Sequence, residues 1–272
     1  MTTVVTAFYP LKSKHSIEKY LEWINNFCKI PCNLVLFTNA ELAPIFQKLR
    51  QDLPTRIMVR PFESYEMTNP EWMALWTKHH GLDREAAIHS PSLYAVWAMK
   101  QEVVSLTIDM NPFKTNWFVW CDIGIHRDAS KHGYYDAFPA RVAAICKPGS
   151  IGFLEVKRIP DSFITNPMAP APFVTLGGGC IIGDKRAWAT FCPAYKAMLR
   201  TMDSRGEFIG KDQTVFFRLL VERVMPFQLF EPQGSVVDPW MQLPCVLAGT
   251  IPAVIDTRFE CAYTSQYPEK SA

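Results

Sequence analysis

A carboxylate follows a strongly apolar run in the segment NWFVWCDIGIHRD, residues 116–128. An isolated charge at the edge of a core is costly unless something pairs with it. Asp122 could therefore cap a turn, pair with Arg127, accept backbone amides or hold a metal ion. Because Mg²⁺ and Mn²⁺ prefer oxygen ligands, Asp122 could also hold a cation that bridges the phosphates of a nucleotide.

A second carboxylate, Asp212, stands where a helical pattern begins in KDQTVFFRLL, residues 211–220. It could cap the first turn and meet the positive end of the helix dipole. It could instead project into a cleft as a general base. The run LGGGCIIG, residues 176–183, allows a ligand to approach the backbone closely, or forms a glycine-rich turn before a strand. It matches neither common glycine-rich phosphate-binding pattern.

Several classes of function lack their sequence signatures. The histidines show no HExxH spacing and no serine lies in a GxSxG elbow, which argues against a zinc site and a serine hydrolase. The eight cysteines form no CxxC pair, so we expect reduced, mostly buried thiols. The formal net charge of +2 without a basic block argues against nucleic acid as a partner. With no leader pattern and no long apolar run, we expect a cytoplasmic protein without a membrane span.

Strand and helix patterns alternate in the first part of the 272-residue chain. We predict strands at residues 3–9, 33–38 and 56–61, and helices at 16–27, with Ser16 as the N-cap, and at 41–50. Short, continuously apolar strands that alternate with helices are typical of a sheet buried between helices. We therefore predict one α/β domain, residues 1–272, with a central, mostly parallel sheet. Ligands of such sheets bind beyond the carboxyl ends of the strands, where Asp122 would lie.

The later elements are predicted in the same way. Residues 63–90 lack a clear pattern, and residues 160–172 are expected to form a loop. The tail beyond Arg258 is expected to be loosely held. We predict helices at residues 90–110, near 137–146 and at 185–202, and strands at 117–121 and 150–156.

Taken together, these segments resemble the HtrL/YibB family, which is similar in fold to the GT-A glycosyltransferases. The resemblance covers roughly residues 3–232 and is carried by TAFYPL, SIEKYLEWINNF, NLVLFTN, NPFKTNWFVWCDIGIHR, GGGCIIG and KDQTVF. It implies a GT-A-like (Rossmann-type) fold that transfers a sugar from a nucleoside-diphosphate sugar, UDP-linked by preference, to a glycan acceptor. Residues 1–128 would bind the nucleotide sugar, and residues 129–258 would bind the acceptor.

The resemblance also implies roles for individual residues. Asp122 would take the place of the metal-binding Asp-x-Asp motif and hold Mn²⁺ or Mg²⁺, although the second acid of that motif is Gly124 here. His126, Asp128 or a distant residue would have to complete the metal site. The nucleotide sugar would be bound by Thr6, Ala7, Phe8, Thr38, Asn39, Lys100, Asp122 and Arg127. Asp212 would be the catalytic base, and Gly177, Gly178, Gly179 and Gln213 would contact the acceptor.

Two alternatives stay open. One is a nucleotidyltransferase or nucleotide-sugar hydrolase on a similar α/β unit. A nucleotidyltransferase should have a glycine-rich loop after the first strand, whereas Tyr9–Lys14 reads YPLKSK. The other is a catalytically inactive protein on the same fold that binds carbohydrate or nucleotide sugar. The missing second acid leaves this alternative open, whereas the presence of Asp122, Lys100 and Asp212 together argues against it.

Overall fold

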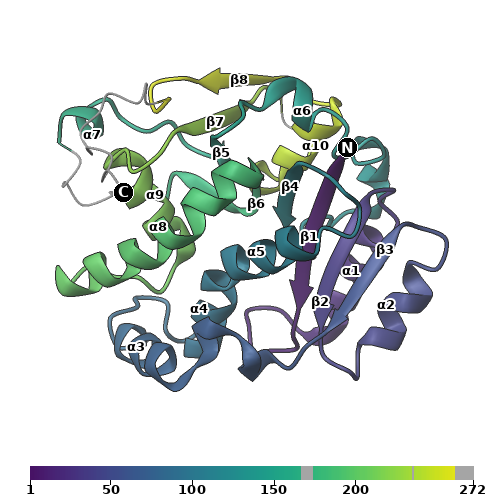
Figure 1. The fold of residues 1–272 in the computed structure, drawn as a ribbon, viewed down its shortest axis with the longest axis horizontal. Coiled ribbons are helices and arrows are strands. Elements are labelled where there is room, and N and C mark those ends of the chain that lie inside the picture. Colours follow the sequence, from purple (N-terminus) through teal and green to yellow (C-terminus); the bar gives the residue numbers. More distant parts are fainter. Residues whose placement is uncertain (167–173, 235, 261–272) are drawn as a thin grey trace, which may run out of the picture.

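The computed structural model describes residues 1–166, 174–234 and 236–260. Its centre is an eight-stranded sheet with the order β3-β2-β1-β4-β6-β5-β7-β8 (Figure 1). Strands β1 to β4, β5 and β7 run in one direction, and β6 and β8 run against them. The chain therefore folds as a mixed α/β domain in which helices flank one central sheet, as the sequence predicts.

The first elements follow the predicted order, with β1 (Thr2–Phe8), α1 (Ile17–Phe27), β2 (Asn33–Thr38), α2 (Ala43–Leu49) and β3 (Thr55–Val59). The Ser16 hydroxyl caps α1 by accepting the Lys19 amide, so a predicted cap is confirmed. The later elements are η1 (Phe62–Ser64), η2 (Glu66–Thr68), α3 (Pro70–His80), α4 (Pro91–Ala98), α5 (Lys100–Met110), β4 (Trp117–Cys121), η3 (Ala129–Tyr134), α6 (Val142–Ile145), β5 (Ile151–Glu155), α7 (Ser162–Thr165), β6 (Leu176–Asp184), α8 (Lys185–Ser204), α9 (Asp212–Val221), β7 (Phe227–Pro232), η4 (Pro239–Met241), α10 (Leu243–Ala248) and β8 (Ala253–Asp256).

Two predictions about helices were wrong. The segment without a clear pattern contains α3, which Asn69 caps and which buries Trp72, Trp76 and His79 along one face. The single helix predicted over residues 90–110 is divided at Met99 into α4 and α5. This division makes Lys100 the first residue of α5, where its side chain is buried.

The glycine-rich run and the C-terminal third also differ from expectation. Gly177, Gly178 and Gly179 lie inside strand β6, not in a turn before it. Their lack of side chains lets neighbouring groups pack directly on the strand. Strands β7 and β8 and helix α10 were not predicted. Near residues 137–146 only the short α6 forms, and α7 lies within the predicted loop 160–172, whose residues 167–172 are outside the described part. Most of the tail beyond Arg258, residues 261–272, is also outside it.

Apolar side chains fill the space on both faces of the sheet. On β1, Val4 faces the layer that contains α1, α2 and α10, whereas Val5 faces the layer that contains α3, α4, α5, α8 and α9. On β2, Leu34 and Leu36 alternate with Val35 and Phe37 in the same way. This burial on both faces explains why the strands are continuously apolar in sequence.

The connections create a crevice at one edge of the sheet. From β1 the chain moves to β2 and β3 on one side, and then crosses to β4 on the other side of β1 (Figure 1). Open α/β sheets bind ligands beyond the carboxyl ends of the strands at such a reversal of strand order. Among the helices that the structure describes, none has both the length and the apolar character needed to cross a bilayer.

Candidate functional site

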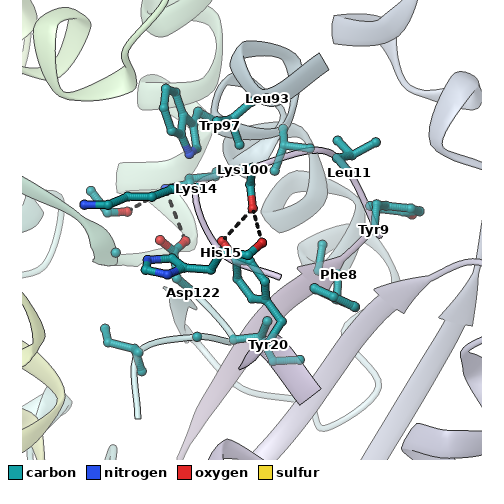
Figure 2. Close-up of a pocket in the computed structure, with 18 of the residues that line it drawn as sticks. Phe8, Tyr9, Leu11, Lys14, His15, Tyr20, Leu93, Trp97, Lys100 and Asp122 are labelled. Carbon is teal, nitrogen blue, oxygen red and sulfur yellow. Dashed lines mark hydrogen bonds and ion pairs between the residues drawn. The ribbon is translucent and has the colours of Figure 1, made fainter. Parts of the chain in front are cut away.

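A cavity of about 730 Å³ lies beyond the carboxyl ends of β1 and β4. Its wall contains the end of β1 with the loop that follows, Leu93, Val96 and Trp97 of α4, Lys100, Trp120, residues 122–125 and Arg127. It also contains Ile17 and Tyr20 of α1, Gly178 and Gly179 of β6, Gln213 of α9 and residues 238, 240 and 241. Figure 2 shows Asp122 on one side of the cavity, Phe8, Tyr9 and Leu11 on the other, and Leu93 and Trp97 at the top of the view.

The buried ammonium of Lys100 joins two carboxylates from different parts of the chain. Its Nζ lies 2.8 Å from Oδ2 of Asp212 and 3.2 Å from Oδ1 of Asp122, and it donates to the Gly178 carbonyl oxygen at 2.8 Å. An ammonium has three N–H groups, which equals the number of these oxygen atoms. Burial opposes the charged form, but Asp122 and Asp212 outweigh burial and raise the pKa of Lys100.

Asp122 is held in place and still open to solvent. The Trp120 indole N–H donates to its Oδ1 at 2.7 Å, and its own backbone N–H donates to the Gly179 carbonyl at 2.7 Å. Its side chain is 42% exposed, in contrast to 7% for Asp212. Asp122 is therefore the carboxylate of the pair that a ligand in the cavity can reach.

Asp212 is enclosed by protein atoms. Its Oδ1 accepts the Gln213 backbone N–H at 2.8 Å, and its Oδ2 faces Lys100 and the Cα of Gly178. Burial raises the pKa of Asp212, and the nearby Lys100 opposes this increase. This environment suits a carboxylate that fixes its neighbours.

Two basic side chains of the cavity wall pack on the ring of Trp23. The Arg127 guanidinium lies 4.4 Å from the centre of the indole ring, and the His15 ring packs edge-on against it at 4.8 Å. Partial burial, followed by the charges of Arg127, Lys14 and Lys19, lowers the pKa of His15. The nearby positive charges of Arg127, Lys14 and Lys19 favour an anionic ligand at this wall. We call Lys14, His15 and Arg127 the basic group.

The structure brings some of the predicted site residues together and leaves others apart. Lys100, Asp122, Asp212, Gly178 and Gly179 form one connected cluster. The cavity wall contains Ala7, Phe8, Lys100, Asp122, Arg127, Gly178, Gly179 and Gln213.

Five predicted residues do not line this cavity: Asp212, whose side chain is buried, and four others. Thr6 is buried in β1, and Gly177 packs against Leu154. Thr38 donates its hydroxyl to the Phe8 carbonyl, and Asn39 accepts the Leu42 amide. Their predicted roles in ligand binding stay predictions.

The side chains around Asp122 do not fit a divalent cation between the two carboxylates, because the Lys100 ammonium lies there. His126 makes its ring contact with His132, and Asp128 accepts from Ser130. Gly124 faces Tyr20 and Trp23. In the described part of the chain, one cluster of side chains is spaced closely enough to hold a metal ion. It consists of Asp83, Glu85 and His89 and does not include Asp122. The expectation of Mn²⁺ or Mg²⁺ stays a prediction, and no step below depends on it.

Sequence reasoning missed several residues of the cavity wall. Lys12, Lys14 and His15 follow directly after β1, and this position at the carboxyl edge of the sheet could have identified them. Asp238 and Trp240 reach the wall from a distant segment that carries no local pattern.

Comparison with known proteins adds little to this description. No family model and no curated protein matches the chain, so membership of the HtrL/YibB family stays a prediction. Among solved structures, the chain is similar to one named "PaToxG Glycosyltransferase", with a TM-score of 0.37 and 11% sequence identity, over 93% of this chain and 87% of that one.

Proposed function

We propose that the chain is a glycosyltransferase that uses a nucleoside-diphosphate sugar, with UDP-sugars as the first donors to test. The observation that carries this proposal is one cavity whose wall contains both the basic group and the fixed, exposed carboxylate of Asp122. The volume of about 730 Å³ is in the range of small-molecule sites. The cavity also lies at the reversal of strand order, where sheets of this kind bind ligands.

The basic group and the carboxylate suit the two halves of such a donor. Arg127 and Lys14 carry the positive charge that a diphosphate needs, and Arg127 can bind phosphate oxygens in a bidentate manner. Asp122 can accept hydrogen bonds from hydroxyl groups of a sugar or an acceptor. The aromatic and apolar side chains Phe8, Tyr20 and Trp97 provide walls against which a base or sugar ring can pack.

In this proposal the acceptor hydroxyl oxygen attacks the anomeric carbon of the donor. The bond between that carbon and the diphosphate oxygen breaks, and its electron pair leaves with the nucleoside diphosphate. The hydroxyl proton passes to Asp122 as general base. Lys14 and Arg127 stabilise the charge that grows on the leaving diphosphate. Asp122 takes the role first expected for Asp212, because the oxygens of Asp212 are enclosed.

The first experiment measures the melting temperature of the chain with UDP, other nucleoside diphosphates and their sugars, each with EDTA or Mn²⁺. A ligand that binds only the folded chain raises this temperature. If a nucleotide stabilises the chain in EDTA, the basic group neutralises the charge of its phosphates. If it stabilises the chain only with Mn²⁺, a bound cation neutralises that charge. If no nucleotide changes the melting temperature, the proposal is wrong.

The second experiment measures transfer as nucleoside diphosphate released in the presence of a glycan acceptor. Asp122→Asn should keep donor binding and lose release, since the amide cannot accept the proton. Lys48→Met is the matched control, because Lys48 lies in the last turn of α2 and does not line the cavity. Binding without release by the unaltered chain, across donors and acceptors, would instead support the inactive nucleotide-sugar-binding protein.

A further inference from the structure

The three oxygen atoms around Lys100 form the kind of ligand set that usually holds a cation. They come from Asp122 after β4, Asp212 at the start of α9 and the Gly178 carbonyl in β6. Lys100 is only 4% exposed, so the positive charge is part of the protein interior. Two carboxylates that share a buried site repel each other unless a cation lies between them.

We propose that the Lys100 ammonium is the built-in cation of this site and occupies the position that a divalent ion between Asp122 and Asp212 would need. The inference concerns cation binding by the protein alone, and it does not require that the ligand of the cavity be a nucleotide sugar.

Distances and charge exclude joint occupancy of this position. The ammonium lies 2.8–3.2 Å from the three oxygens. A divalent ion bound to the same oxygens would lie at about 2.0–2.6 Å from each, which is the place that Nζ now fills. The two positive charges would also repel each other strongly in a buried site.

The fold explains why a side chain can supply this charge. Because α4 ends at Ala98 and α5 begins at Lys100, the lysine stem enters the site from a helix start and packs near the Trp120 ring, whose centre lies 5.8 Å from Nζ. Gly178 brings its carbonyl and its bare Cα against the same group. Lys100 is thus a positioning residue that joins three segments of the chain.

Removal of the ammonium should convert the site into a metal site. In Lys100→Ala, two carboxylates and one carbonyl remain around an open space with no cation. With Mn²⁺ as the probe, 1 mM should raise the melting temperature of this variant by about 5 °C or more, if the ion binds in the micromolar range. Lys100→Met fills the space with an uncharged side chain of similar length and should show no such increase.

Two comparisons assign the effect to the proposed ligands. The Mn²⁺ response of Lys100→Ala should disappear when Asp212→Asn or Asp122→Asn is added. The unaltered chain should show no Mn²⁺ stabilisation that Asp122→Asn removes. A folded Lys100→Ala variant that ignores Mn²⁺ would overturn the inference, as would an unaltered chain whose Mn²⁺ stabilisation is lost in Asp122→Asn.

If Lys100→Ala fails to fold in EDTA, recovery of the folded state by Mn²⁺ replaces the melting temperature as the supporting result. If Lys100→Ala folds neither in EDTA nor in Mn²⁺, the inference is tested on the unaltered chain. It is overturned if Mn²⁺ stabilises the unaltered chain and Asp122→Asn removes that stabilisation. None of these measurements depends on sugar transfer, so the inference can fail while the proposed function holds, and the reverse.

Discussion

The close packing of Gly178 against Asp212 gives a prediction whose size follows from the structure. A Cβ added to Gly178 would lie 2.7 Å from Oδ2 of Asp212 and 3.1 Å from its Cγ and Oδ1. Asp212 has a short side chain that Lys100 and the Gln213 amide hold in place. Gly178→Ala therefore has to displace the carboxylate, move the strand, or both.

Two costs contribute to the expected loss of stability. Overpacking of a well-packed interior costs about 1–3 kcal/mol. A weakened hydrogen bond to a charged group in a buried site costs about 1.5–3 kcal/mol. Since one displacement causes both effects, we expect a loss of about 3 kcal/mol in the free energy of unfolding, not the sum of the maxima. For a chain of this size that corresponds to a fall of about 6–12 °C in melting temperature.

Gly179→Ala is the matched control, because it makes the same chemical change at the next position of the same strand. Its Cβ would meet Asp122 and Ile125 at 3.5 Å, which is ordinary contact. We expect its effect to stay within about 1 kcal/mol of zero, since alanine also restricts the unfolded chain. Urea unfolding of both variants measures the difference. If Gly178→Ala is as stable as Gly179→Ala, the buried packing of Asp212 described here is incorrect.

Three further predictions concern the metal motif, the basic group and pH. Gly124→Asp should lower the melting temperature and create no Mn²⁺ response, because its Cβ would meet Trp23 at 3.3 Å and Tyr20 at 3.5 Å; a new Mn²⁺ response would contradict this geometry. Arg127→Met should weaken nucleoside-diphosphate binding about tenfold in calorimetric titration, as expected for a lost charge-assisted contact, and Lys48→Met should not. Burial lowers the pKa of His126 from 6.5 to about 4, so the unfolded chain binds more protons between these values and stability should fall as pH falls from about 6.5 to 4. His126→Gln should make this part of the pH–stability profile flatter, and an unchanged profile would show that other groups cause it.

Local sequence patterns predict the first half of the sheet well, for identifiable reasons. Strand β2 is found at the predicted residues, and α1 begins after the predicted cap Ser16, because burial on both faces and a capping hydroxyl leave clear local signals. The division of the helix at Met99 leaves no local signal in the sequence, since Met99 has helix-like backbone angles and neighbours that favour helices. The glycine run gives no strand signal because glycine is rare in strands, whereas packing of Asp212 against Gly178 and of Leu154 against Gly177 requires glycine in β6.

The sequence indicates which residues belong to the candidate site better than it indicates how they are arranged. Asp122, Lys100 and Asp212 are each visible as charges in apolar surroundings, and such residues need partners. Their partnership depends on contacts between residues 22 to 112 positions apart along the chain, from Lys100 with Asp122 to Lys100 with Asp212. The different exposure of the two carboxylates is likewise a product of tertiary packing, which explains why sequence reasoning assigned the base to the enclosed one.

The packing around Gly124 gives a physical reason why this chain lacks the second acid of the Asp-x-Asp motif. A motif with two acids on one loop places both carboxylates on the same side of a shared cation. Here position 124 faces the aromatic rings of α1, so an acid at that position could not join Asp122 without a shift of the helix. The second carboxylate comes from the start of α9, and the charge between the two comes from Lys100. An ammonium has fewer positive charges than a divalent ion, and that of Lys100 already has three oxygen neighbours. If the chain transfers sugar, the leaving diphosphate therefore depends on the basic group, and loss of Arg127 should impair catalysis as well as binding.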